Sequence, residues 1–465
     1  MKNSLRTMLE TKIEKQRQQL KQGQNSIKLI AACRLNEGVV VLSTERKKEL
    51  AKRLYDSTKK ISFFIPASGS GSRMFHFLFE FMEQPNETNR GYVERFLTHI
   101  EDFAFFNQFP EDVQRALKNR SMDIGELTAF ILNNKGFGLA HLPKGLIPFH
   151  KMGPFLLSPF QEHVIQGSAL NQFATSFHFT IQPKFAELIE KSLQHLEGIT
   201  AKKFNVSYSV QNPETDSVAF DSNFEPVCNE DGTVLTRPGG HGALFENFKQ
   251  IESDLIFIKN IDNIQHFNKS ELALETQQML GGLFLEVQEK ILQLCERFDR
   301  DMFVQLNATY QLFDKQVESM SENQICSLLQ RPLRVCGMVI NEGQPGGGPF
   351  WVEYDGEISK QIIEKAQIHP TVDQMKVMIQ SSHFNPVMMV CQGNSEKQDL
   401  NQYRDENAYF KVDKNHRGQA IQFVELPGLW NGSMAKWNTV FVEVPSETFS
   451  PVKSVLDLLS NAHRP

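Results

Sequence analysis

Residues 60–74 read KISFFIPASGSGSRM, and they indicate the fold class of the whole chain. The β-branched and aromatic run at 61–65 predicts a buried strand, and the apolar segment from Met74 to Met82 predicts a helix. Between them lies a loop of small residues that ends at Arg73. In α/β proteins a strand, a glycine loop and a helix in this order present backbone N–H groups to a phosphate. The stretch therefore predicts an α/β protein with a phosphate-binding loop.

Taken alone, the glycine loop is a weak signal. No Gly-Lys-Ser/Thr follows it, so it is not a P-loop. Met74 stands where a dinucleotide fingerprint would place its third glycine. A tight structural turn explains the loop in isolation equally well, so its interpretation as a nucleotide site depends on the rest of the chain.

Composition excludes several classes of protein. The 49 basic and 55 acidic residues give a net charge of −6, which leaves no basic excess for binding nucleic acid. The six cysteines lie far apart, which predicts reduced thiols rather than a metal cluster or a disulfide framework. The N-terminus lacks the apolar core of a signal peptide, and no apolar run is long enough to span a bilayer. We expect a soluble, cytoplasmic protein without nucleic-acid or membrane partners; the oligomeric state stays open.

Three segments are expected along the chain. Residues 1–60 are expected to form a helical N-terminal segment, 61–445 an α/β domain, and 446–465 a C-terminal segment. Helical insertions are expected at about 76–138 and 267–330. From about residue 171, strands alternate with helices, as in an α/β sheet. The expected strands there are 177–181, 206–211, 255–259, 333–340, 387–391, 420–426 and 439–444.

Four later motifs follow the glycine loop ASGSGSR (67–73) in a distinctive order. They are a Pro-Lys at 143–144, RPGGHGAL at 237–244, NIDN at 260–263 and FSPVKSVLDLL at 449–459. This order resembles the UDP-sugar pyrophosphorylases, within the sugar nucleotidyltransferases of glycosyltransferase-A-like fold. The whole chain also resembles an uncharacterised bacterial family, domain of unknown function 4301, that is related to these enzymes. The resemblance implies an α/β fold with a mixed sheet and helices on both faces.

Each motif is similar to a family signature. The glycine loop resembles the family's Gly-Gly-x-Gly-Thr-Arg, and RPGGHGAL its Pro-x-Gly-His-Gly. NIDN resembles the Asp-Asn that ends a central strand, and FSPVKSVLDLL the phosphate-binding lysine segment of UDP-glucose pyrophosphorylases. The resemblance implies a Mg²⁺-dependent nucleotidyltransferase that joins UTP and a sugar 1-phosphate into a UDP-sugar and pyrophosphate, or catalyses the reverse.

Nucleotidyl transfer requires no side-chain nucleophile, because positioning and charge neutralisation do most of the catalysis. Such a site needs close backbone approach, cations on the phosphates, and a carboxylate for Mg²⁺. The expected nucleotide contacts in the loop are Ala67, Ser68, Gly69, Ser70, Gly71 and Ser72.

The charged candidates have distinct expected roles. Arg73 would bind the triphosphate in a two-pronged fashion, and Lys144 and Lys453 would add point charges. Asp262, at the end of a strand, is the expected metal ligand. An aspartate there is often only a turn former, and Lys144 is equally compatible with a surface lysine. Some seventy residues separate Arg73 from Lys144, where the family has about one helix. The assignment of Lys144 therefore requires the insertion to fold back.

The remaining candidates come from the resemblance. Gly240, His241 and Gly242 would contact the base or ribose, and Gln211 matches a glutamine near the uracil, although a capping or core role explains it almost as well. His241 has no partner at metal-ligand spacing. Sugar contacts are expected from Asn341, Glu364, His383 and Asn385, each of which is equally explained as a turn or a cap.

Two other functions stay open. A non-catalytic nucleotide-sugar-binding protein would explain the displaced Lys144 and the long insertions. A glycosyltransferase is less well supported, because the Asp-Asn at 262–263 is not an Asp-x-Asp. The sequence leaves open the base, the sugar phosphate and the direction of reaction.

Overall fold

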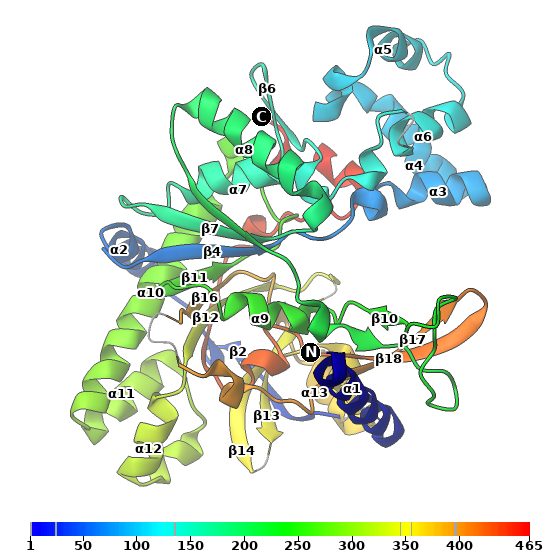
Figure 1. Ribbon diagram of the computed structural model, residues 1–465. Helices are drawn as coiled ribbons and strands as arrows, with labels where there is room; N and C mark the ends of the chain where they lie inside the picture. Colours follow the sequence, from blue (N-terminus) through cyan, green and yellow to red (C-terminus); the bar gives the residue numbers. More distant parts are fainter. Residues whose placement is uncertain (1, 24–25, 134–135, 345, 355, 395–397) are drawn as a thin grey trace. The chain divides into compact units, whose positions relative to one another are not determined.

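The computed structural model describes residues 2–465, apart from 24–25, 134–135, 345, 355 and 395–397 (Figure 1). The chain forms two compact units. Unit 1 consists of Met1–Arg46, Gln211–Ile256 and Leu280–Val444, and unit 2 of Lys47–Val210, Phe257–Met279 and Pro445–Pro465. The glycine loop and the C-terminal lysine segment both belong to unit 2.

Unit 2 contains three parallel strands. They are β4 (Ile61–Pro66), β7 (Thr175–Thr180) and β8 (Asn205–Ser209), with β7 in the middle. The first five residues of β4 are buried, as their apolar character predicts. Helix α7 (Pro159–Gly167) packs directly on the strands, because a Cβ on Gly167 would lie 2.6 Å from Phe177 Cε1 and 2.9 Å from Phe63 Cε2. Helix α8 (Ala186–Thr200) packs beside α7 and connects β7 to β8.

The first insertion is helical, as expected. It contains α3 (His76–Glu83), α4 (Glu87–Thr98), α5 (Glu111–Lys118) and α6 (Ile124–Leu132), which gather in one group (Figure 1). Its core is rich in phenylalanine, and Phe103 and Phe105 stack with centroids 5.3 Å apart. Val452 and Leu456 from the C-terminal segment belong to the same core. The insertion therefore supports the segment that carries Lys453.

Unit 1 contains a mixed sheet. Strand β12 (Leu333–Ile340) runs parallel to β19 (Asn438–Glu443) and antiparallel to β16 (Met389–Gln392) and β15 (His383–Phe384). Strand β3 (Gly38–Val40) extends it parallel to β19, and β2 (Arg34–Leu35) pairs with β3. The expected α/β fold with a mixed sheet is confirmed. Strand β11 (Leu255–Ile258) carries the chain from unit 1 into unit 2.

Further elements complete unit 1. An antiparallel sheet contains β1 (Lys28–Ala32), β13 (Gly348–Tyr354) and β14 (Glu357–Ile363). Two pairs follow, β17 (Phe410–His416) with β18 (Gln419–Glu425) and β9 (Ser217–Val218) with β10 (Thr236–Arg237). The second expected insertion is helical: α10 (Glu271–Glu296) begins in unit 2 and continues in unit 1, and α11 (Arg300–Tyr310) and α12 (Glu322–Leu329) belong to unit 1.

The first sixty residues correct the expectation of a helical segment. Helices α1 (Lys2–Gln22) and α2 (Thr44–Tyr55) are present, but β1, β2 and β3 lie between them. The sequences KLIAA and GVV have strand character. Their partners β13 and β19 are hundreds of residues away, so the local pattern could not reveal the pairing.

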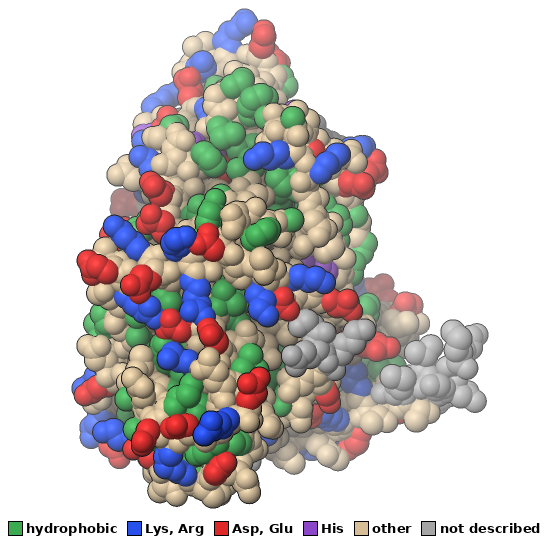
Figure 2. All heavy atoms as spheres, turned by 90° about the vertical axis from the view of Figure 1, so that its left-hand side faces the viewer, with side chains coloured by type: hydrophobic (Ala, Val, Ile, Leu, Met, Phe, Trp, Pro, Cys, Tyr) green, Lys and Arg blue, Asp and Glu red, His purple; other side chains and the backbone are tan. Residues whose placement is uncertain are grey.

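Acidic and basic side chains are interspersed over the face of the molecule drawn in Figure 2. Such mixing is typical of a solvated surface. Within the described part of the chain, no helix combines the length and apolar character that crossing a membrane requires.

Candidate functional site

The glycine loop leads from β4 into a 3₁₀ turn at Gly71–Phe75, and α3 begins at His76. Ser70 caps the turn, since its Oγ accepts the N–H of Ser72 at 3.2 Å. The N–H groups of Ala67 and Gly71 also have partners within the protein, since they donate to the carbonyls of Thr180 and Leu142, respectively. Those of Ser68, Gly69 and Ser70 donate to no residue in the described ranges. These three amides are the ones available to a phosphate.

The Pro-Lys motif returns to the glycine loop. The N–H of Lys144 donates to the Gly69 carbonyl at 3.0 Å, and the Gly71 N–H donates to Leu142 O at 2.9 Å. A Cβ on Gly71 would lie 2.9 Å from that same carbonyl oxygen, so the close approach requires glycine. The insertion thus ends beside the residues where it begins, and the long separation in sequence does not separate Lys144 from the loop.

Lys144 and Lys453 meet at one carboxylate. Lys144 Nζ lies 3.0 Å, and Lys453 Nζ 2.9 Å, from Asp262 Oδ2. Lys144 Nζ also donates to the carbonyl of Val452 at 2.8 Å, next to Lys453 in the chain. Asp262 is buried, whereas the Lys453 side chain is 62% exposed. Three residues predicted from three separate motifs therefore form one cluster, which we call the phosphate cluster together with Arg73.

The charges in the phosphate cluster perturb one another. Burial would raise the pKa of Asp262, but the nearby Lys144 and Lys453 ammonium groups outweigh it, and the pKa lies below its ordinary value. Burial lowers the pKa of Lys144, Asp262 opposes this shift, and Lys453 and Arg73 add to it. Arg73 itself is exposed. The cluster holds more positive than negative charge, which suits the binding of an anion.

Backbone contacts fix Asp262 against the C-terminal segment. Val452 N–H donates to the Asp262 carbonyl at 2.9 Å, and Ser450 N–H donates to Asn263 Oδ1 at 2.9 Å. Beyond Lys453, the carboxylate of Asp457 accepts the N–H groups of Lys453 and Ser454, both at 2.8 Å. These contacts hold the backbone on both sides of the Lys453 side chain.

The residues present fit a divalent metal that arrives with a nucleotide. Both lysines use Asp262 Oδ2, and no residue in the described ranges donates to Oδ1. Mg²⁺ commonly takes one or two carboxylates and completes its shell with water and substrate phosphates. No group of three or more His, Cys, Asp or Glu suited to a metal occurs among the described residues. Asp262 would thus be a single protein ligand, and its carboxylate suits a metal that phosphates also hold.

The candidates for base recognition belong to unit 1. Gly240 has a φ of +76°, which favours glycine, and a Cβ on Gly242 would lie 2.2 Å from the Pro427 carbonyl oxygen. A structural explanation therefore exists for both glycines. His241 is exposed, and its ring lies edge-on to that of Trp430, with the ring centroids 4.9 Å apart.

Gln211, also in unit 1, has a polar atom without a partner. Its side-chain nitrogen is buried and bonds to no described residue. An unsatisfied buried donor is unusual in a folded protein, so this amide has bonding capacity to offer.

The sugar candidates also belong to unit 1, and the structure brings only some of them together. Asn341 N–H donates to Ser382 O at 2.9 Å, which places Asn341 beside His383. Burial lowers the pKa of His383. The side-chain amide of Asn385 donates to Gly337 O at 2.9 Å, and its Oδ1 accepts the Val387 N–H. The side chain therefore has structural contacts.

Glu364 lies in different surroundings. Its Oε1 accepts the side-chain amide of Asn431 at 3.1 Å, and its side chain caps the short turn Lys365–Gln367. The sequence had left two explanations of Glu364 open, a sugar contact or a turn or cap, and these contacts are those of a cap.

The sequence did not single out the side chain of Lys259, which follows β11 and is only 6% exposed. Burial lowers the pKa of Lys259 to about 8. The signal that would have found it is a lysine directly after the apolar run LIFI. The sequence also did not single out a buried cluster of three histidines and Glu162, which is described below.

Comparison with known proteins places the chain in a family. The family model described as "Domain of unknown function (DUF4301)" matches residues 3–464. The chain belongs to this family. No curated protein matches the sequence of this DUF4301 member.

Distant likenesses to solved structures exist. One is UDP-glucose phosphorylase from Trypanosoma brucei, with 13% identity and a TM-score of 0.45, over 95% of this chain and 72% of the other. Another is a mutant UDP-glucose pyrophosphorylase from Leishmania major in complex with UDP-Glc, with 12% identity and a TM-score of 0.46, over 97% and 74%.

Proposed function

We propose that this chain is a nucleotidyltransferase that joins UTP and a sugar 1-phosphate into a UDP-sugar and pyrophosphate, or catalyses the reverse. One observation carries the proposal. Lys144 and Lys453, from motifs far apart in the sequence, both contact Asp262, beside a glycine loop with three available amides. Such a convergence is what phosphoryl chemistry needs and what a set of unrelated structural turns would not produce.

Each residue of the phosphate cluster has a role in the proposed reaction. An oxygen of the sugar phosphate forms a bond to the α-phosphorus, and pyrophosphate leaves with the electron pair of the broken P–O bond. The amides of Ser68, Gly69 and Ser70 bind phosphate oxygens, and Arg73 binds two of them at once. Lys144 and Lys453 neutralise charge that develops on the transferred and leaving groups.

Asp262 has two functions in this proposal. It holds both ammonium groups in place, which preorganises them for a phosphate. Its second oxygen would hold Mg²⁺, which when bound supplies positive charge to the phosphates. Gln211, Gly240, His241 and Gly242, and the sugar candidates, stay predictions of nucleotide and sugar contact.

The test is a screen of nucleoside triphosphates against sugar 1-phosphates, in the presence of Mg²⁺, that measures pyrophosphate release. We expect release with UTP and at least one sugar 1-phosphate. Calorimetry with UTP and UDP-sugars runs in parallel. Binding without turnover would support the non-catalytic nucleotide-sugar-binding protein, and neither binding nor turnover would contradict both functions.

A further inference from the structure

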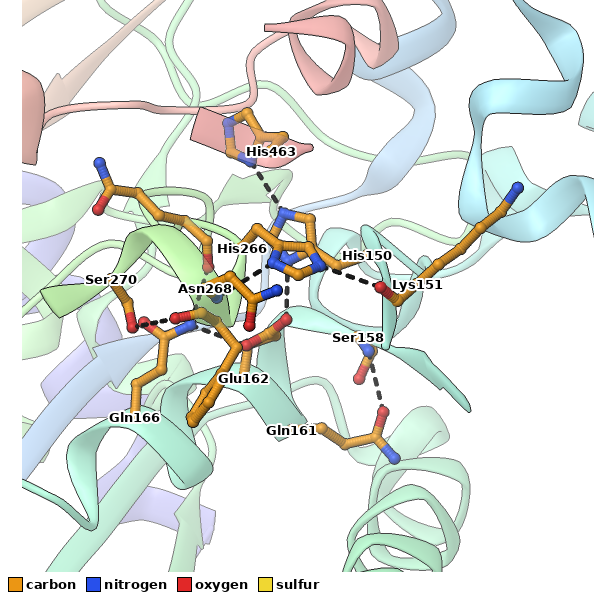
Figure 3. A network of polar contacts seen from close by, with 12 residues as sticks. His150, Lys151, Ser158, Gln161, Glu162, Gln166, His266, Asn268, Ser270 and His463 are labelled. Carbon is orange, nitrogen blue, oxygen red and sulfur yellow. Dashed lines mark hydrogen bonds and ion pairs between the residues drawn. The ribbon is translucent and has the colours of Figure 1, made fainter. Parts of the chain in front are cut away.

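A buried polar cluster in unit 2 lies outside the phosphate cluster (Figure 3). His150 Nδ1 lies 2.8 Å from Glu162 Oε1, and His150 Nε2 lies 2.9 Å from His463 Nδ1. The chain of contacts ends on the backbone, where His463 Nε2 lies 3.0 Å from the Ser450 carbonyl oxygen. The side chains of His150 and Glu162 are 0% and 1% exposed. We call Glu162, His150, His463 and Ser450 the histidine relay.

Hydrogen-bond chemistry fixes the direction of each contact. A carbonyl oxygen only accepts, so His463 Nε2 carries a hydrogen and donates it to Ser450. Burial, aided by His150 and His266, lowers the pKa of His463 to about 3, so its Nδ1 is an acceptor at neutral pH. His150 Nε2 must then donate to it, and one further hydrogen lies between His150 Nδ1 and the Glu162 carboxyl group. Both ring nitrogens of His150 and of His463 therefore have hydrogen-bond partners.

Further contacts brace the relay. Gln166 Nε2 donates to Glu162 Oε2 at 2.7 Å and to the Gln265 carbonyl at 2.8 Å. The backbone N–H of His266 donates to Ala462 O at 2.8 Å, and its ring Nε2 donates to the Lys151 carbonyl at 2.9 Å. Figure 3 shows the rings of His150 and His266 close together, with centroids 5.3 Å apart.

The relay connects the two ends of the Lys453 segment. Ser450 lies three residues before Lys453 and His463 ten residues after it, and one hydrogen bond joins them. The side chain of Lys453 is largely exposed, and among the described residues its ammonium group contacts Asp262 alone. Its position therefore depends on the backbone that carries it, and an error of about 1 Å at such a group can lower a rate about 10²-fold.

We propose that His463 and His150 are positioning residues, which hold residues 450–463 in register so that Lys453 stays at Asp262. The catalytic consequence rests on the proposed function, but the positional consequence does not. His463 touches neither Asp262 nor Lys453 among its described contacts, and it acts through the backbone at Ser450.

Two variants of His463 divide its contacts. His463→Ala removes both hydrogen bonds of the ring. His463→Gln keeps an amide N–H that reaches the Ser450 carbonyl and so restores the contact next to the lysine segment. We measure the acylation rate of Lys453 by peptide mass spectrometry, with exposed Lys191 as the internal control, and amide hydrogen exchange over 449–463.

We expect His463→Ala to accelerate acylation of Lys453 and exchange of the segment about fivefold, with Lys191 unchanged, because the hydrogen bond to the Ser450 carbonyl, which anchors the segment, is lost together with the contact to His150. His463→Gln should restore most of the wild-type rates. Unchanged rates in a folded His463→Ala protein would overturn the proposal. If His463→Ala does not fold, His463→Gln decides alone: acylation and exchange near the wild-type rates support the proposal, and an acceleration of about fivefold in both contradicts it.

An activity measurement separates positioning from general loosening. If His463 acts through Lys453, then His463→Ala lowers kcat only while Lys453 is present and causes no further loss in Lys453→Met, whereas His463→Gln keeps most of the wild-type kcat. Multiplicative losses would contradict the proposal. Absence of wild-type turnover would refute the proposed function, whereas acylation and exchange would still decide this inference. A stoichiometric metal in the purified protein, held by the histidines, would also overturn it.

Discussion

Asp262 joins two lysines that are 118 and 191 residues away in the sequence. Its carboxylate is buried, and two ammonium groups compensate its charge. Sequence alone indicated each of these residues through a motif, and it could not show that they touch. The contact itself converts three weak signals into one chemical site.

Replacing Asp262 with Asn should destabilise the protein by about 1–3 kcal/mol at neutral pH, because two ammonium groups lose their partner, one of them well exposed to water. The pKa of Asp262 is lowered on folding, so its stabilisation is present above the unfolded pKa of about 3.9 and is lost as pH falls through the folded pKa. Urea unfolding of both proteins from pH 7 to pH 3 measures this. A stability difference that grows toward low pH would contradict the ion-pair account.

The histidine relay shows the limit of sequence reasoning at this scale. His150 and His463 lie 313 residues apart, and neither belongs to a recognisable motif. A lone histidine in a sequence is compatible with almost any role. Only the fold shows that these two share a hydrogen bond.

At the scale of elements, strand β4, the glycine loop and the helix after it were predictable because their signals are local. Strand β12 was predicted with its observed bounds, Leu333–Ile340, since its residues are apolar apart from Arg334, and seven of the eight are buried. The hairpin of β13 and β14 was missed, because Gly348 and Pro349 open β13 and the polar run at 359–361 interrupts β14, so neither strand shows a continuous apolar run or a regular alternation. Strands β1 and β3 were missed because their partners, β13 and β19, are distant.

The joint between the glycine loop and the Pro-Lys motif predicts an effect of Gly71→Ala. A Cβ there would lie 2.5 Å from Ile147 Cδ1 and 2.9 Å from Leu142 O, and the carbonyl cannot move without parting Lys144 from the loop. We expect a loss of about 1–3 kcal/mol in unfolding free energy. The control is Gly69→Ala, where no heavy atom lies within 4 Å. Equal stability of the two variants in chemical denaturation would contradict the close approach.

At the scale of the whole molecule, the net charge led us to expect no binding of nucleic acid. The order of the motifs suggested nucleotidyl transfer. Neither the composition nor the motif order could show that the first insertion shares its core with the C-terminal segment. Hydrophobic contacts between residues 75–149 and 452–458 are long-range and have no sequence signature. The insertion therefore has a structural role in placing Lys453, which the sequence left open.

This shared core predicts the effect of Leu456→Ala. Leu456 is 6% exposed, and its truncation should lower the free energy of unfolding by about 2–5 kcal/mol. Leu188→Ala is the control, since Leu188 is 47% exposed, and it should change stability by no more than about 0.5 kcal/mol. Thermal and urea unfolding measure both. A neutral Leu456→Ala would mean that the segment does not depend on the core.

The most direct test of the central claim is pyrophosphate release by Lys453→Met beside Lys191→Met. The two lysine side chains have matched exposure, 62% and 64%, and both belong to unit 2. If Lys453 neutralises phosphate charge, Lys453→Met should lower kcat about 10²–10³-fold while the protein stays folded. Lys191→Met should keep the wild-type rate. Full activity of Lys453→Met, or an equal loss in both variants, would contradict the account.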